Sequence, residues 1–179
     1  MKLRLTIAAL AAYITAFNGH CNDLMEEAEK GRHWQAVSGT AIHYFSTAVI
    51  HSVVETETGL IQRSTDTIEL SGDLQGRVLY HPTTVIDFAT NTLTNTGHQV
   101  FSGTILGSEP VLVADDSFLF NVDMSPGGAT AGTVFLTDRI AGPRTRCVIQ
   151  IVGTGMTAEG DGLADYSGRC RVRGRRSLD

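Results

Sequence analysis

The sequence has little positive charge, little proline and no long apolar run beyond its N-terminal segment. Its 14 lysines and arginines are outnumbered by 19 aspartates and glutamates, which gives a formal net charge of −5. Proteins that bind nucleic acid or anionic membranes by general electrostatic attraction are normally basic, so we expect neither partner. After the first segment no stretch is long and apolar enough to read as a membrane helix, so we expect no membrane attachment of the mature form.

Several catalytic motifs are also missing. No Gly-x-Ser-x-Gly turn is present, and no glycine-rich loop stands between a strand and a helix, which disfavours a serine hydrolase or a nucleotide site. The six histidines form neither His-x-His nor His-Glu-x-x-His. Ligands gathered from separate strands stay open as an alternative, but the sequence predicts no metal and no cofactor.

The N-terminus has the pattern of a secretory signal peptide. Lys2 and Arg4 precede an apolar run over residues 5–17, which is short for a membrane span. A buried first helix is the alternative. We expect a signal peptide at residues 1–21, a polar lead-in at 22–33, one β domain at 34–174 and a basic tail at 175–179. The mature protein is then secreted or lies in the lumen of the secretory pathway.

The rest of the chain consists of short alternating runs separated by turn residues. The 19 glycines, with frequent Thr, Ser and Val, favour strands and turns over helices. Examples of such runs are residues 34–46, 48–57, 76–80 and 84–89, and no window shows a sustained helical stripe. This pattern predicts an all-β barrel or sandwich built from hairpins.

Two cysteines lie in the last two predicted strands. Cys147 shares one parity with Ile149 and Ile151, and Cys170 shares one parity with Tyr166 and Val172. Each strand therefore places its cysteine on the apolar face. A hairpin centred between residues 158 and 159 brings the two opposite each other, so we expect a cross-strand disulfide. Two free buried thiols are the alternative.

The same region carries a resemblance. The segments GTGMTAEGDGLADYSG (residues 153–168) and FSGTILGSE (residues 101–109) resemble the terminal part of the allene oxide cyclase-like and dirigent-like barrels. The resemblance covers residues 67–173 and implies a small antiparallel eight-stranded barrel of calycin or allene oxide cyclase-like type, with an apolar cavity. Members of this group steer ring closure or coupling of reactive organic intermediates without a cofactor. Residues 156–165 depart from the family pattern, so no family catalytic residue is carried over.

The inward face of a small barrel either fills the lumen or lines a pocket. Both alternatives are open from the sequence. If a pocket forms, its polar groups are expected to orient or protonate a ligand. The candidate catalytic residues are Tyr44, His51, Tyr80 and Asp116. The candidate substrate-binding residues are Phe101, Phe118, Phe120, Met124 and Phe135.

The last strand and the tail are rich in arginine. Arg169, Arg171 and Arg173 alternate on one face, and Arg175 and Arg176 follow. A solvated strand accounts for them, and a docking surface for an acidic partner is the alternative.

Together these features favour a barrel that binds a hydrophobic small molecule and steers its cyclisation or rearrangement, as a cofactor-free cyclase or isomerase of secondary metabolism. A lipocalin-like carrier of an apolar ligand and a structural barrel are the alternatives. The sequence leaves open whether copies of the chain associate into a homo-oligomer.

Overall fold

The fold is a single antiparallel β-sheet of ten strands. The structure is a computed structural model and describes residues 33–173. Within this range, no helix is long and apolar enough to cross a membrane. The strands are β1 (Gln35–Glu55), β2 (Gly59–Gly72), β3 (Leu74–Asp87), β4 (Thr92–Ile105), β5 (Val111–Asp115), β6 (Leu119–Asp123), β7 (Thr130–Leu136), β8 (Asp138–Ala141), β9 (Arg144–Met156) and β10 (Gly162–Arg173).

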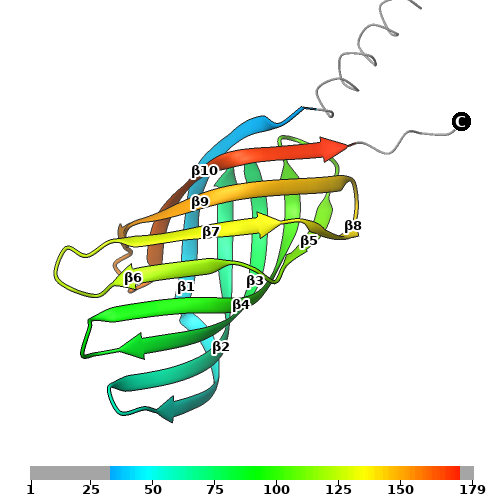
Figure 1. The fold of residues 1–179 in the computed structure, drawn as a ribbon. Coiled ribbons are helices and arrows are strands. Elements are labelled where there is room, and N and C mark those ends of the chain that lie inside the picture. Colours follow the sequence, from blue (N-terminus) through cyan, green and yellow to red (C-terminus); the bar gives the residue numbers. More distant parts are fainter. Residues whose placement is uncertain (1–32, 174–179) are drawn as a thin grey trace, which may run out of the picture.

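The sheet closes on itself. Its hydrogen-bonded order is β3-β2-β1-β10-β9-β7-β6-β4-β5-β8, and β3 also pairs with β4. Both β5 and β6 pair with β4, while β8 pairs with β5 and β7 with β6. The pairs β5–β6 and β7–β8 are thus two interrupted strands, so the ring has eight positions (Figure 1). The predicted eight-stranded antiparallel barrel is confirmed, and the sandwich alternative is wrong.

The break between β5 and β6 is held by a buried carboxylate. Asp115 Oδ1 accepts hydrogen bonds from the backbone N–H and the hydroxyl of Ser117. Its Oδ2 accepts from Gln99 Nε2 at 2.9 Å and from the Phe135 N–H at 2.8 Å. One side chain therefore ties β4, β7 and the irregular segment together, which gives the backbone groups at the break the partners that they need when buried.

Some predicted strands merge. Residues 34–46 and 48–57 form the single strand β1, with an irregularity between Tyr44 and Val49. Residues 76–80 and 84–89 join as β3, which continues through Pro82 opposite Gly97. A β-bulge bends a strand without ending it, so a break in alternation does not have to be a turn. The short β8 was not predicted.

One end of the barrel is filled with side chains. The fully buried residues there include Leu74, Phe101, Ile105, Val113 and Leu136. The hydroxyl of Tyr166 closes this end, because it accepts a hydrogen bond from the Leu74 N–H at 2.8 Å and faces the Leu74 carbonyl at 3.3 Å. Gly39 gives this hydroxyl its space, since a Cβ there would collide with it.

The predicted disulfide is confirmed. Cys147 and Cys170 are register partners on β9 and β10, their Cα atoms are 4.1 Å apart and their sulfurs are bonded. Both are fully buried at the filled end. A disulfide indicates an oxidising compartment. The predicted signal peptide (residues 1–21), nearly all of the lead-in (22–33) and the basic tail (175–179) lie outside the described residues.

Candidate functional site

The other end of the barrel is hollow. A cavity of about 750 Å³ lies inside it, within the size range of small-molecule sites. The sequence left a filled lumen and a pocket as alternatives, and the barrel has both, one at each end. Phe45, Ile50 and Met156 line the cavity and are 47%, 58% and 58% exposed, so the cavity communicates with solvent at this end.

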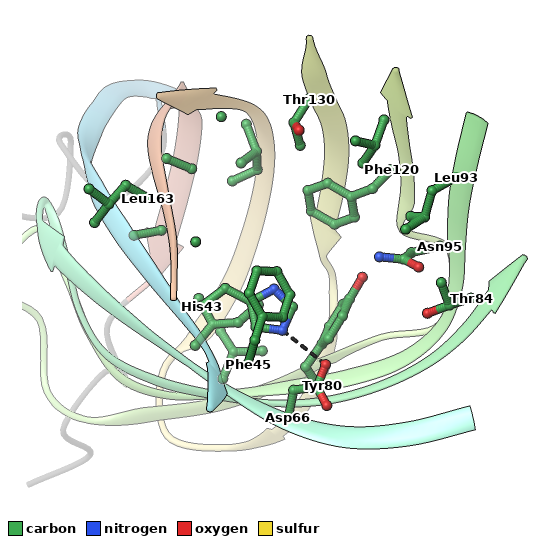
Figure 2. Close-up of a pocket in the computed structure, with 18 of the residues that line it drawn as sticks. His43, Phe45, Asp66, Tyr80, Thr84, Leu93, Asn95, Phe120, Thr130 and Leu163 are labelled. Atoms are coloured by element: carbon green, nitrogen blue, oxygen red, sulfur yellow. Dashed lines mark hydrogen bonds and ion pairs between the residues drawn. The ribbon is translucent and has the colours of Figure 1, made fainter. Parts of the chain in front are cut away.

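The cavity wall is mainly apolar. Facing strands contribute aliphatic side chains, and Figure 2 shows Leu93 and Leu163 on facing walls of the hollow. The polar residues of the lining are His43, Gln62, Ser64, Asp66, Tyr80, Thr84, Asn95, Gln99, Thr130, Thr154 and Tyr166. An apolar wall with a few convergent polar groups is typical of sites that hold and orient an organic ligand.

His43 and Asp66 form a hydrogen-bonded pair between β1 and β2. His43 Nε2 lies 2.9 Å from Asp66 Oδ2, and the two side chains are 19% and 6% exposed. When Asp66 is ionised it accepts the Nε2 proton, which selects one tautomer and leaves Nδ1 as a proton acceptor. The pair thus has the arrangement of a base and the group that orients it.

Tyr80 presents its hydroxyl to the same space from β3. Its side chain is 1% exposed, and burial raises the pKa of the phenol far above its ordinary value. Hydrogen bonding by Asn95 acts in the opposite direction, and the charge of Asp66 raises the pKa further. In Figure 2 the hydroxyl points toward Asn95. Tyr80 therefore stays neutral and keeps a proton that its hydroxyl can donate in a hydrogen bond.

Two buried acceptors in the cavity have no protein partner. Among the described residues, Asp66 Oδ1 and Asn95 Oδ1 are the buried side-chain atoms without a hydrogen bond. Leaving such an oxygen unpaired costs about 1–3 kcal/mol. Both residues line the cavity, but these two oxygens are themselves buried within its wall.

Aromatic rings form one end of the hollow. The ring centroids of Tyr80 and Phe118 are 4.7 Å apart, and His43 meets Tyr80 edge-on at 5.3 Å. Phe45 stacks on the other side of His43 at 4.1 Å. These contacts restrict the rotamers of His43 and Tyr80, so their polar groups are held in place before a ligand arrives.

The glycine-rich β9–β10 connection positions this end of β1. Asp161, buried in that connection, accepts hydrogen bonds from the Ser46 N–H at 2.9 Å and from the Ser46 hydroxyl at 3.1 Å. Ser46 lies in the irregularity of β1, between two lining residues, Phe45 and Ala48. The connection therefore holds the bulge that turns both of these side chains inward.

Three of the predicted site residues lie in or beside the cavity. Tyr80 and Phe120 line it. Phe118 is buried behind Tyr80, in ring contact with both of the others. Phe120 lies across Gly132 of β7, where a Cβ would collide with its ring.

Three of the four predicted catalytic residues lie outside the cavity. Tyr44 points outward from β1, and its hydroxyl donates to Glu69 Oε2 at 3.2 Å. His51 is exposed and contacts the Thr65 hydroxyl at 2.7 Å. Asp116 is exposed, one residue past the end of β5. None of them lines the cavity, so the structure brings only Tyr80 of this set into it.

The remaining predicted substrate-binding residues are also elsewhere. Phe101 is fully buried in the filled end of the barrel. Phe135 lies between the inward-facing Val134 and Leu136 and therefore points outward. Met124 follows β6 and is not part of the lining.

The sequence reasoning missed His43, Asp66 and Asn95. On β1, one face carries Ala41, His43 and Phe45 and the other carries Ile42 and Tyr44, and either could point into the barrel. Both sets mix apolar and polar residues, so alternation alone does not decide between them. On β2, Asp66 shares its parity with Ile68 and Leu70, and an acid next to two apolar residues on one face was the available signal.

No group of three or more His, Cys, Asp or Glu side chains within residues 33–173 is arranged to hold a metal ion. Comparisons of the chain with known protein families, with curated proteins and with solved structures find no match.

Proposed function

We propose that this barrel binds a hydrophobic small molecule in its hollow end and steers the cyclisation or rearrangement of that molecule without a cofactor. The observation that carries the proposal is the His43–Asp66 pair, which lies with the neutral Tyr80 in one largely apolar cavity of about 750 Å³. Both a proton acceptor and a proton donor are then available to one ligand in a largely apolar site.

The proposed chemistry moves a proton within the ligand. His43 Nδ1 removes a proton from the ligand, and Asp66 stabilises the imidazolium that results. Tyr80 donates a hydrogen bond to the ligand oxygen on which negative charge develops. His43 then returns the proton to another ligand atom, so no oxidant, reductant or metal is consumed. The walls contribute by holding the flexible ligand in a folded, reactive shape.

The lining of the cavity defines the ligand more closely. The mainly apolar lining with its polar residues suits a ligand that combines an apolar skeleton with at least one hydroxyl group. A negatively charged ligand is disfavoured, because Asp66 would repel it.

The proposed location is outside the cytoplasm, in the secretory pathway or beyond it. The disulfide supports an oxidising compartment, and the pattern of residues 1–21 is the sequence argument for export. The proposed partner is a small molecule rather than nucleic acid, in keeping with the net charge of −5.

A carrier is the second candidate, and the mainly apolar lining favours it. A carrier releases its ligand unchanged, and it requires the cavity but not the His43–Asp66 pair. The two functions are therefore separable by variants of that pair.

The first test is native mass spectrometry of protein purified from its natural source, to detect a small molecule that travels with it. Ala164→Phe fills the cavity from β10, and Asp165→Phe places the same side chain on the outer face as a matched control. We expect the ligand with wild type and with Asp165→Phe, and its loss with Ala164→Phe.

The second test incubates the identified ligand, or its acyclic precursor, with wild type, His43→Gln and Asp66→Asn. The enzyme is supported if wild type converts the ligand and both variants convert it about 10²–10⁴ times more slowly. A loss of this size is expected when acid–base catalysis is removed. Binding without conversion by wild type indicates the carrier. Equal retention of the ligand by Ala164→Phe and wild type, with both folded, contradicts both functions.

A further inference from the structure

Outside the cavity, the outer face of β9 and β10 carries a group of four arginines. Arg144 and Arg146 come from β9, and Arg171 and Arg173 come from β10. They surround a depression of about 180 Å³ whose lining consists of these four residues. We refer to them as the arginine cluster.

The register places like charges directly opposite each other. Arg146 is the partner of Arg171, and Arg144 is the partner of Arg173. Like charges in opposed positions of an antiparallel pair destabilise it. The sequence contains 19 aspartates and glutamates, yet no carboxylate within residues 33–173 forms an ion pair with the cluster. Arg77, by contrast, pairs with Glu69 at 3.6 Å.

Neighbouring groups hold the cluster in place despite this repulsion. The disulfide between Cys147 and Cys170 joins the register pair next to Arg146 and Arg171, so the two strands cannot separate or slip there. Trp34 lies against the guanidinium of Arg171, 5.6 Å from its ring centroid. A cation over an aromatic ring is attracted to it and loses freedom of movement. The site is therefore preorganised without a counter-ion from the described chain.

We propose that the arginine cluster is a binding site for a multivalent oxyanion, a group that carries two or more phosphate or sulfate units. Guanidinium groups donate paired hydrogen bonds that match the oxygens of phosphate and sulfate. Four of them around one depression suit a ligand with two tetrahedral anionic groups better than a single carboxylate. The surrounding protein is acidic overall, so the cluster is a local positive site rather than part of a general basic surface.

This site is separate from the cavity. The cluster residues alternate with Thr145, Cys147 and Cys170, which are buried, so their side chains lie on the opposite face of the sheet from the lumen. The inference does not depend on the proposed function, and each can fail without the other.

The test measures thermal unfolding and calorimetric binding of the full chain. The probes are sodium pyrophosphate and a sulfated heparin disaccharide, with sodium chloride at matched ionic strength. The variants are Arg146→Gln and Arg173→Gln. Arg63→Gln is the control, because Arg63 is an exposed strand arginine on β2, away from the cluster.

We expect saturable binding of a probe by wild type and by Arg63→Gln, with a rise in melting temperature that chloride does not reproduce. Each cluster variant should bind at least about tenfold more weakly, because it loses charge-assisted hydrogen bonds. Without a probe, at low salt, the cluster variants should be as stable as wild type or more stable, because repulsion is reduced. When the probe is added, wild type should become more stable than the cluster variants.

The relative affinity of the two probes identifies the source. Tighter binding of pyrophosphate indicates a free or esterified diphosphate, and tighter binding of the disaccharide indicates a sulfated sugar. Equal effects of all three salts, or equal loss in Arg63→Gln and the cluster variants, would overturn the proposal.

Discussion

Tyr80 combines two properties that are seldom found in one side chain, since it is buried against other rings and it faces the cavity with its hydroxyl. Burial keeps the phenol neutral by raising its pKa, so the hydroxyl can donate a hydrogen bond at any pH at which the fold persists. Tyr44, which sequence reasoning ranked equally, bonds Glu69 on the outside. The two tyrosines therefore form a natural pair for comparison.

Tyr80→Phe should separate catalysis from stability. Removing one hydroxyl changes the free energy of unfolding by at most about 1.5 kcal/mol, the usual size of a single hydrogen bond. Turnover of the cavity ligand should fall by a factor of about 10²–10³, the loss seen when one donor to a developing oxyanion is removed. Urea unfolding and rate measurements on Tyr80→Phe and Tyr44→Phe provide the check. Equal rates in the two variants would remove Tyr80 from the reacting groups.

At the scale of elements, the β9–β10 hairpin supports both ends of the barrel. Its disulfide lies in the filled end, and Asp161 in its connection holds the bulge of β1 at the hollow end. The glycine-rich connection thus has a structural role, because it contacts β1 through Asp161.

Breaking the disulfide should destabilise the barrel as a whole. Cys147 and Cys170 are 23 residues apart, and closing a loop of that length stabilises a fold by about 3 kcal/mol in the chain-entropy description. We expect a loss of this size in urea unfolding when the wild type is compared with and without reductant. The Cys147→Ala/Cys170→Ala variant serves as the control, because reductant should not affect it. If oxidised and reduced wild type are equally stable, the disulfide does not stabilise the barrel.

Loss of the Asp161 contacts should loosen the cavity rather than the filled end. Asp161→Ala removes two hydrogen bonds from Ser46 to a carboxylate, at a cost of about 2–3 kcal/mol. Amide hydrogen exchange should rise in residues 44–49 and stay unchanged around Cys147. Glu159→Ala, at an exposed position of the same connection, should leave both regions unchanged. If Asp161→Ala raises exchange equally over the whole barrel, the contact between Asp161 and Ser46 has no local role.

The strands also show how much of the fold can be predicted from the sequence. The β9–β10 pairing and its disulfide followed from parity, because each strand has one clearly apolar face. The inner face of β1 could not be predicted in this way, because the face with His43 and the face with Tyr44 have similar polarity. The bulge between Tyr44 and Val49 further shifts the parity within the strand. That bulge depends on Asp161, 115 residues away from Ser46, and such a long-range contact leaves no local signal.

For the whole molecule, the division into a filled and a hollow end separates stability from binding. Most of the fully buried aliphatic side chains lie at the end that carries the disulfide, while Asp66 and Asn95 with their unpaired oxygens lie at the other. A scaffold arranged in this way tolerates changes at the cavity wall, because the core that holds the barrel together lies apart from it.

The buried tyrosines make the fold sensitive to alkaline pH. The pKa values of Tyr80 and Tyr166 are raised in the folded protein, and burial is the largest cause for both. In the unfolded chain a tyrosine ionises near pH 10. Above about pH 10 the unfolded state therefore releases protons that the folded state keeps, and the free energy of unfolding falls as the pH rises further.

Urea unfolding at pH 8, 10 and 11 should show this decline in wild type, and tyrosinate absorbance should report the ionisation that accompanies it. Tyr80→Phe should decline less steeply, because one of the two buried phenols is gone. Tyr44→Phe should behave as wild type, because Tyr44 lies on the outer face, where solvent screens its interactions. If wild type and Tyr80→Phe lose stability in parallel, the Tyr80 hydroxyl is open to water in solution and is not the buried, neutral donor that the proposed chemistry requires.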